Sequence, residues 1–113
     1  MKKFEHELIL CIVNEGFSEV VMDSAREVGA TGGTILHARG TANQEAEQFF
    51  KITVQPEKEM VMIIVPSKIK DDVLHALYKS VGLKTPGQGI AFSVPVDNVV
   101  GLSSFTSDEK TDK

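Results

Sequence analysis

Two stretches of the chain repeat the same order of apolar and polar positions. In each stretch, a continuous apolar run is followed by apolar residues at helical spacing and then by a second β-favouring run. The continuous runs cover residues 8–13 and 60–65. Uninterrupted runs of this kind are typical of strands buried in a sheet. The pattern therefore predicts two strand–helix–strand units in one chain.

The first unit contains a helix between its two strands. Phe17, Val21 and Ala25 recur at the spacing of one helix face. Gly29 follows at the position where helices commonly end in a left-handed turn. The second strand of this unit is predicted over residues 33–39.

The second unit has clearer boundaries. Pro66 closes its first strand, and Ser67 is predicted to cap the helix that follows. Gly82 is predicted to end that helix, and residues 90–94 form the fourth strand before Pro95. The inward stripe of the helix is expected to consist of Ile69, Val73, Ala76, Leu77 and Val81.

The order of elements predicts an α+β fold of the ferredoxin-like, split and duplicated βαβ type. This fold is a four-stranded antiparallel sheet with two helices on one face. Residues 1–102 are expected to form this domain, and residues 103–113 a polar C-terminal tail. Because two helices cover one face only, the apolar positions on the other face predict oligomerisation through it.

Composition narrows the classes of function. The chain has 113 residues, 12 Lys+Arg against 16 Asp+Glu and a net charge of −4. This mildly acidic balance argues against nucleic-acid binding, and no apolar run is long enough to insert into a membrane. Cys11 is the single cysteine, so no internal disulfide can form. We therefore expect a cytoplasmic protein.

Three segments in the right order resemble the PII signal-transduction family. They are residues 28–34 (VGATGGT), residues 62–66 (MIIVP) and residues 86–92 (PGQGIAF). The resemblance covers about residues 1–102. It implies a homotrimer with nucleotide sites between subunits. It also implies a mobile loop that contacts a partner protein. Such a protein is a sensor and regulator of nitrogen or carbon metabolism, and we expect no enzymatic activity.

The resemblance also implies a nucleotide-binding set. Thr34 matches a threonine near the adenine, and Gly40 matches a glycine at the root of the mobile loop. Gly87 and Gly89 match glycines whose amides approach the phosphates, as residues without a side chain can do. The expected nucleotide-binding residues are Thr34, Arg39, Gly40, Gly87, Gln88 and Gly89. For Arg39, a solvated strand end and a contact with phosphate remain open alternatives.

The effector loop is expected over residues 41–59. Gln44 falls where the family binds metal or 2-oxoglutarate, and Lys58 falls near a lysine that contacts the same oxo-acid. Phe49 and Phe50 either anchor the loop on the sheet or contact a partner, since aromatic side chains are favoured at interfaces. The partner implied by the family is an enzyme, a regulator or a membrane transporter.

The chain departs from the family at three positions that usually carry cations. Ile90 replaces a lysine after the second glycine, and Gly101 and Ser103 replace two arginines. A hydrogen bond to a charged group contributes roughly 1.5–3 kcal/mol, so the loss of several would weaken triphosphate binding. We therefore expect AMP or ADP in preference to ATP, with Mg²⁺ and 2-oxoglutarate left open.

Two other classes of function are considered. His6, His37 and His75 could bind a metal, as in a trimeric divalent-ion tolerance protein, but no pair has ligand spacing. A small acylphosphatase-like hydrolase would need a basic loop after the first strand, where Glu15 places an acid instead.

Three sulfur-containing residues are expected to have structural roles. Cys11 is expected to be a small buried hydrophobe. Met60 and Met62 alternate along a predicted strand and are expected in the core.

Overall fold

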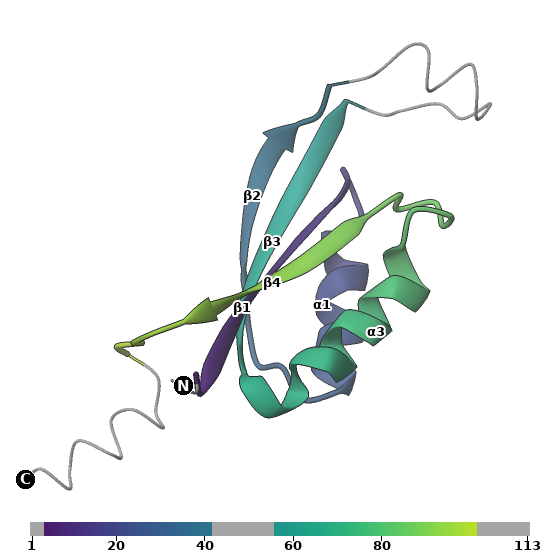
Figure 1. The fold of residues 1–113 in the computed structure, drawn as a ribbon. Coiled ribbons are helices and arrows are strands. Elements are labelled where there is room, and N and C mark those ends of the chain that lie inside the picture. Colours follow the sequence, from purple (N-terminus) through teal and green to yellow (C-terminus); the bar gives the residue numbers. More distant parts are fainter. Residues whose placement is uncertain (1–3, 42–55, 102–113) are drawn as a thin grey trace, which may run out of the picture.

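The computed structural model describes residues 4–41 and 56–101. Their elements follow the predicted order (Figure 1). The elements are β1 (His6–Asn14), α1 (Ser18–Glu27), β2 (Thr34–Arg39), β3 (Glu57–Pro66), a short 3₁₀ turn (Ser67–Ile69), α3 (Lys70–Val81) and β4 (Ile90–Val96).

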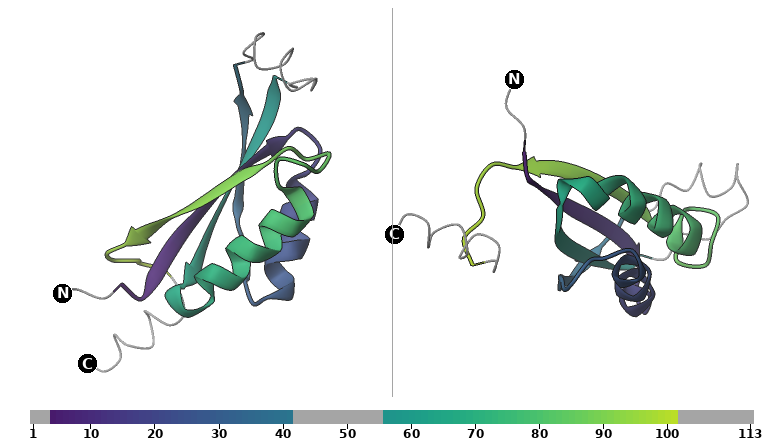
Figure 2. Two further views of the ribbon diagram at one scale, coloured as in Figure 1. Left: turned by 45° about the vertical axis from the view of Figure 1, so that its right-hand side comes forward. Right: turned by 90° about the horizontal axis from the view of Figure 1, so that it is seen from below.

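The four strands form one sheet in the order β2-β3-β1-β4. Every neighbouring pair is antiparallel, with Cys11 of β1 opposite both Val61 of β3 and Ala91 of β4. Both helices lie on the same side of this sheet (Figure 2). The predicted ferredoxin-like fold is therefore confirmed.

Alternation along the strands divides the sheet into two faces. On β1, Ile9, Cys11 and Val13 are fully buried beneath the helices. The positions between them point the other way, toward a surface that the helices do not cover. We call this surface the open face. Its apolar residues are Leu8, Leu10, Ile12, Leu36, Met60, Met62, Ile64, Ile90, Phe92 and Val94.

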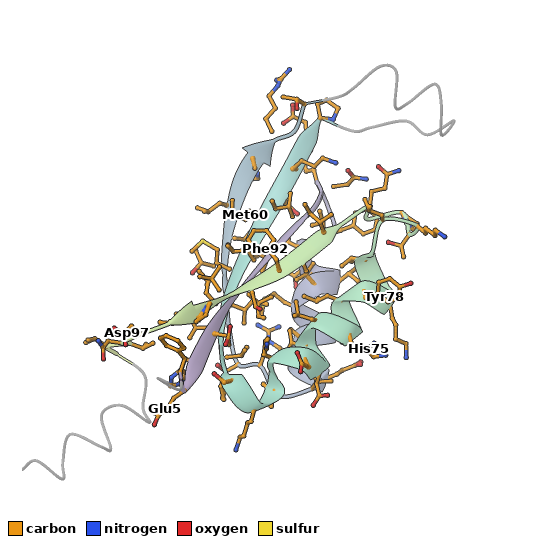
Figure 3. The ribbon with its side chains drawn as sticks, viewed as in Figure 1. Glu5, Met60, His75, Tyr78, Phe92 and Asp97 are labelled. Atoms are coloured by element: carbon orange, nitrogen blue, oxygen red, sulfur yellow. The ribbon has the colours of Figure 1, made fainter. Side chains whose placement is uncertain are left out.

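The expected core position of Met60 and Met62 is wrong. Both alternate on β3 with fully buried Val61 and Ile63 and lie only partly covered on the open face. Figure 3 shows Met60 and Phe92 on the side of the sheet away from α3. An uninterrupted apolar run hides this division, because the sequence is equally apolar at odd and even positions.

Each helix buries one stripe against the sheet. α1 buries Val21, Met22 and Ala25, and α3 buries Val73, Leu77 and Val81 at successive turns. Gly29 has a φ of 113°, so the predicted left-handed end of α1 is confirmed.

Two predicted boundaries are wrong. Ser67 does not cap a helix: its hydroxyl donates to the carbonyl of Phe4 at 2.6 Å, and α3 begins after Ile69 with no side-chain cap. Pro95 does not end the fourth strand. It lies within β4, where the edge of a sheet tolerates a residue without an amide hydrogen.

Candidate functional site

Three segments that are distant in the sequence meet at one end of the sheet. Asn14 ends β1 and pairs with Lys58 near the start of β3. Gly40 follows β2, and its amide donates to the carbonyl of Pro56 at 2.7 Å. The loop of residues 85–89 reaches the same end between α3 and β4. We call Asn14, Gly40, Lys58 and residues 85–89 the sheet-end cluster.

The glycine loop is held by its own backbone. The amide of Gln88 donates to the carbonyl of Thr85 at 3.0 Å, and the amide of Gly89 donates to the carbonyl of Val81 at 2.6 Å. Gln88 has a φ of 48°, in the left-handed region. The Gly89 amide is thus engaged within the protein. Within residues 4–41 and 56–101, the Gly87 amide donates no backbone hydrogen bond, and the residue is buried.

Packing restricts both glycines, and it excludes a side chain at Gly89. A Cβ on Gly89 would lie 2.5 Å from the oxygen of Val81 and 2.8 Å from the Cγ1 of Val13. A Cβ on Gly87 would lie 3.3 Å from Val81 and 3.4 Å from the Cδ1 of Phe17. The Gly-x-Gly motif therefore has a structural reason that is independent of any ligand.

Asn14 joins this loop to Lys58. Its side-chain nitrogen donates to the carbonyl of Pro86 at 3.0 Å and to Oε1 of Gln88 at 3.4 Å. Its side-chain oxygen accepts a hydrogen bond of 2.7 Å from Nζ of Lys58. No role for Asn14 is predicted from the sequence. Its only signal there is a polar residue at the end of an apolar run.

Lys58 lies in β3 and not in the connecting loop. The expected loop boundary at residue 59 is wrong, because β3 begins at Glu57. Burial lowers the pKa of the Lys58 ammonium, since partial loss of water disfavours the charged form. Lys58 forms no ion pair with any residue in the described part of the chain. It is a partly desolvated cation whose neighbour, Asn14, is neutral.

Glu59 points to the opposite side of the sheet from Lys58. Its Oε1 accepts hydrogen bonds from the amides of Gly16 at 3.1 Å and Ser18 at 3.2 Å, at the start of α1. The residue is only 9% exposed. Its carboxylate thus stabilises the start of α1 and is not part of the sheet-end cluster.

Two of the expected nucleotide-binding residues are not part of the cluster, although Arg39 is next to Gly40 in the chain. Arg39 is exposed and approaches Glu57 at 3.9 Å. Thr34 begins β2 opposite Met62, on the open face and at the far end of the strand from Gly40. Within one subunit, Thr34 does not reach the glycine loop. Gln44, Phe49 and Phe50 lie outside the described residues.

The histidines are distributed over three elements. His6 lies on β1, His37 on β2 and His75 on α3. No group of three possible metal ligands occurs among residues 4–41 and 56–101. Neither described helix has the length and apolarity needed to cross a bilayer.

Cys11 is buried, as expected for a small hydrophobe. Burial raises the pKa of its thiol to about 11. At neutral pH the side chain is therefore an unreactive thiol.

The family comparison matches most of the chain. The model of the family described as nitrogen regulatory protein P-II aligns with residues 6–104. The chain belongs to the P-II family. It is thus a PII-like signalling protein, and the predicted resemblance is confirmed. No functionally curated protein is similar enough to count as a match.

Solved structures of P-II proteins share the fold. Arabidopsis thaliana PII bound to citrate has a TM-score of 0.67 at 19% identity, covering 90% of this chain and 84% of that one. A putative PII-like signaling protein from Thermus thermophilus has a TM-score of 0.63 at 18% identity, covering 85% and 90%. The Bacillus subtilis GlnK–ATP complex has a TM-score of 0.63 at 17% identity, covering 88% and 89%. At these identities, the likeness concerns the fold alone.

Proposed function

We propose that this chain is a homotrimeric PII-like regulator that binds an adenine nucleotide between subunits and controls a partner protein through the segment that connects β2 to β3. The sheet-end cluster carries the proposal. It places the root of the connecting segment, the glycine loop and a partly desolvated cation at one end of the sheet. A ligand bound there would contact the residues from which the connecting segment starts.

The open face supports assembly into a trimer. Leu36, Ile90 and Phe92 remain 45%, 50% and 44% exposed in the single chain. Large contiguous apolar surfaces of this kind mark interfaces. Asn14 and Lys58 occupy even positions on β1 and β3, so their side chains lie at the rim of the same face. A second copy of the chain bound to the open face would therefore lie next to the cluster and could contribute further residues to the ligand-binding site.

The charges favour a ligand with few phosphates. Lys58 is the one cation of the sheet-end cluster, and the exposed Arg39 nearby faces Glu57. Anionic ligands occur in the comparison structures, which hold ATP in GlnK and citrate in Arabidopsis PII. For this chain we propose AMP or ADP in preference to ATP. The Lys58 ammonium is also the group that would pair with a carboxylate of 2-oxoglutarate.

Calorimetric titration of the purified chain tests the ligand. ATP, ADP and AMP are each added with and without Mg²⁺ and 2-oxoglutarate. We expect binding of ADP or AMP with ATP no tighter, and a loss of about tenfold or more in the Lys58→Met variant. Lys68→Met is the matched control, because Lys68 is exposed in the turn at the other end of β3. Absence of binding across the whole panel would refute the nucleotide proposal.

Sedimentation equilibrium tests the assembly. The chain should sediment as a trimer at micromolar concentration, and Phe92→Asp should shift it toward the monomer, because burying a charge in an apolar interface is unfavourable. Glu19→Asp, on the exposed side of α1, should leave the mass unchanged. A monomeric wild-type chain would contradict the proposed architecture.

The connecting segment is the part of the chain that we propose for contact with a partner protein. A transporter, enzyme or regulator of nitrogen or carbon metabolism would bind the connecting segment in a nucleotide-dependent manner. Affinity capture with and without ADP, comparing the chain with its Lys58→Met variant, tests this. A partner recovered equally under all four conditions would contradict regulation by the nucleotide.

A further inference from the structure

We infer that Asn14 is a positioning residue that couples the glycine loop to Lys58, so that a change at either one is transmitted to the other. The inference deepens the proposed function by assigning how the site would signal, and its ligand-dependent part rests on that function. The hydrogen bonds that carry it belong to the protein alone.

Asn14 is bonded to the loop through both its backbone and its side chain. Its backbone amide donates to the carbonyl of Gly87 at 2.9 Å, and its side-chain nitrogen donates to the carbonyl of Pro86 at 3.0 Å. Its side-chain oxygen accepts the 2.7 Å hydrogen bond from Lys58. One planar amide thus connects two segments that are distant from each other in the sequence.

The orientation of this amide is determined by its neighbours. A lysine ammonium can only donate and a backbone carbonyl can only accept, so the amide oxygen must face Lys58 and the amide nitrogen must face Pro86. Reversing the amide would break both hydrogen bonds at once. A flip of the amide therefore loses both contacts together, and each contact favours the orientation that the other needs.

The contact chain continues from Lys58 to the root of the connecting segment. A Cβ on Gly40 would lie 3.1 Å from Cε and 3.5 Å from Cγ of Lys58, so the lysine stem covers this glycine. The Gly40 amide in turn donates a hydrogen bond to the carbonyl of Pro56. An anion that draws the ammonium of Lys58 away from Asn14 would release the glycine loop on one side and uncover Gly40 on the other.

The first experiment uses no ligand. Amide hydrogen exchange of Gln88 and Gly89 is measured by NMR on the full chain, because these amides report opening of the glycine loop. Lys58→Met should accelerate their exchange by about threefold to tenfold, although Lys58 does not contact the loop backbone directly. In the Asn14→Ala background, the same Lys58→Met substitution should add nothing.

A conservative pair separates the two halves of the link. Asn14→Asp keeps an acceptor for Lys58 but opposes a carboxylate oxygen to the carbonyl of Pro86, so it should also accelerate exchange of Gln88 and Gly89. Asn98→Asp introduces the same charge at an exposed position after β4 and should have no effect. If Lys58→Met leaves the exchange of these two amides unchanged, Asn14 merely anchors the loop and the coupling is refuted.

The second experiment measures ADP affinity in the same variants. Asn14→Asp should weaken ADP binding by about tenfold and adenosine binding much less, because only ADP brings negative charge to the new carboxylate. Equal losses for both ligands would contradict the inference. If the wild-type chain binds neither ligand, the proposed nucleotide function fails while the exchange experiment still decides the coupling.

Discussion

Glu59→Ala tests whether a residue of β3 stabilises the start of α1. The first turn of a helix leaves amide groups without partners inside the helix. In α1 the cap position is Phe17, which offers no side-chain acceptor. Glu59 takes its place: its carboxylate accepts hydrogen bonds from the amide of Ser18, the first residue of α1, and from Gly16 just before the helix. Removing the carboxylate leaves both amides without this partner.

The loss of stability expected in Glu59→Ala follows from the two hydrogen bonds that the carboxylate accepts. A hydrogen bond to a charged group contributes roughly 1.5–3 kcal/mol, and loss of an N-cap costs about 0.5–2 kcal/mol. Some water will reach the amides of the variant, so the two hydrogen bonds will not be lost at full value. We expect Glu59→Ala to lower the free energy of unfolding by about 2–4 kcal/mol. For a domain of this size that corresponds to a fall in Tm of about 10–20 °C.

Urea unfolding followed by circular dichroism, at one fixed protein concentration, gives the measurement. Glu57→Ala is the matched control, because it changes the same residue type on the same strand. Glu57 is exposed and meets Arg39 only at 3.9 Å, so its loss should cost less than about 0.5 kcal/mol. Glu59→Gln, which keeps one acceptor oxygen, should fall between the two. If Glu59→Ala and Glu57→Ala unfold at the same urea concentration, the capping argument is wrong.

Three further outcomes are expected. In a thermal melt, Gly89→Ala should destabilise the chain by about 3 kcal/mol or prevent folding, because its Cβ would lie 2.5 Å from a backbone oxygen. Gly32→Ala is the control and should be neutral or slightly stabilising, because the space around Gly32 is open. Burial raises the pKa of the Cys11 thiol from 9.0 to about 11. The stability that the protonated Cys11 contributes is therefore complete below pH 9. Between pH 9 and 11, the free energy of unfolding should fall by about 1.4 kcal/mol per pH unit. Cys11→Ala should lack that alkaline loss when unfolding is measured across this range. Ser67→Ala should cost about 1 kcal/mol through the lost hydrogen bond to Phe4 while leaving the helical circular dichroism unchanged, and a loss of helix would restore the capping role that the sequence predicts.

The sequence determines the order and type of the elements well because their periodicities are strong. The helix stripe of Val73, Leu77 and Val81 is visible in the sequence and fully buried in the structure. Met60 and Met62 show the limit of this reasoning. A strand that is apolar on both faces gives no sign of which face the helices cover, and that depends on the packing of segments distant in sequence.

The site is predictable only where backbone geometry demands a particular residue. Gly89 is visible in the sequence because close packing against a backbone oxygen excludes a side chain at this position, whereas a Cβ at Gly87 would make only a tight contact. Asn14 and Lys58 are joined by strand pairing across 44 residues, and no local pattern reports such a contact. Thr34 lies away from the glycine loop within one chain, so its predicted role depends on a second copy.

The division of β1 and β3 into two faces has a consequence for engineering this protein. Odd positions such as Ile9 and Val61 hold the helices, whereas even positions such as Leu10 and Met62 contribute nothing to that packing. One set of alternating residues thus determines how the helices pack on the sheet, and the other set forms the surface that other chains could contact. A designer could recode the even set for a new oligomer, or for a lone polar subunit, and leave the internal architecture untouched. Insertion of one residue within either strand would exchange the two sets and destroy both at once.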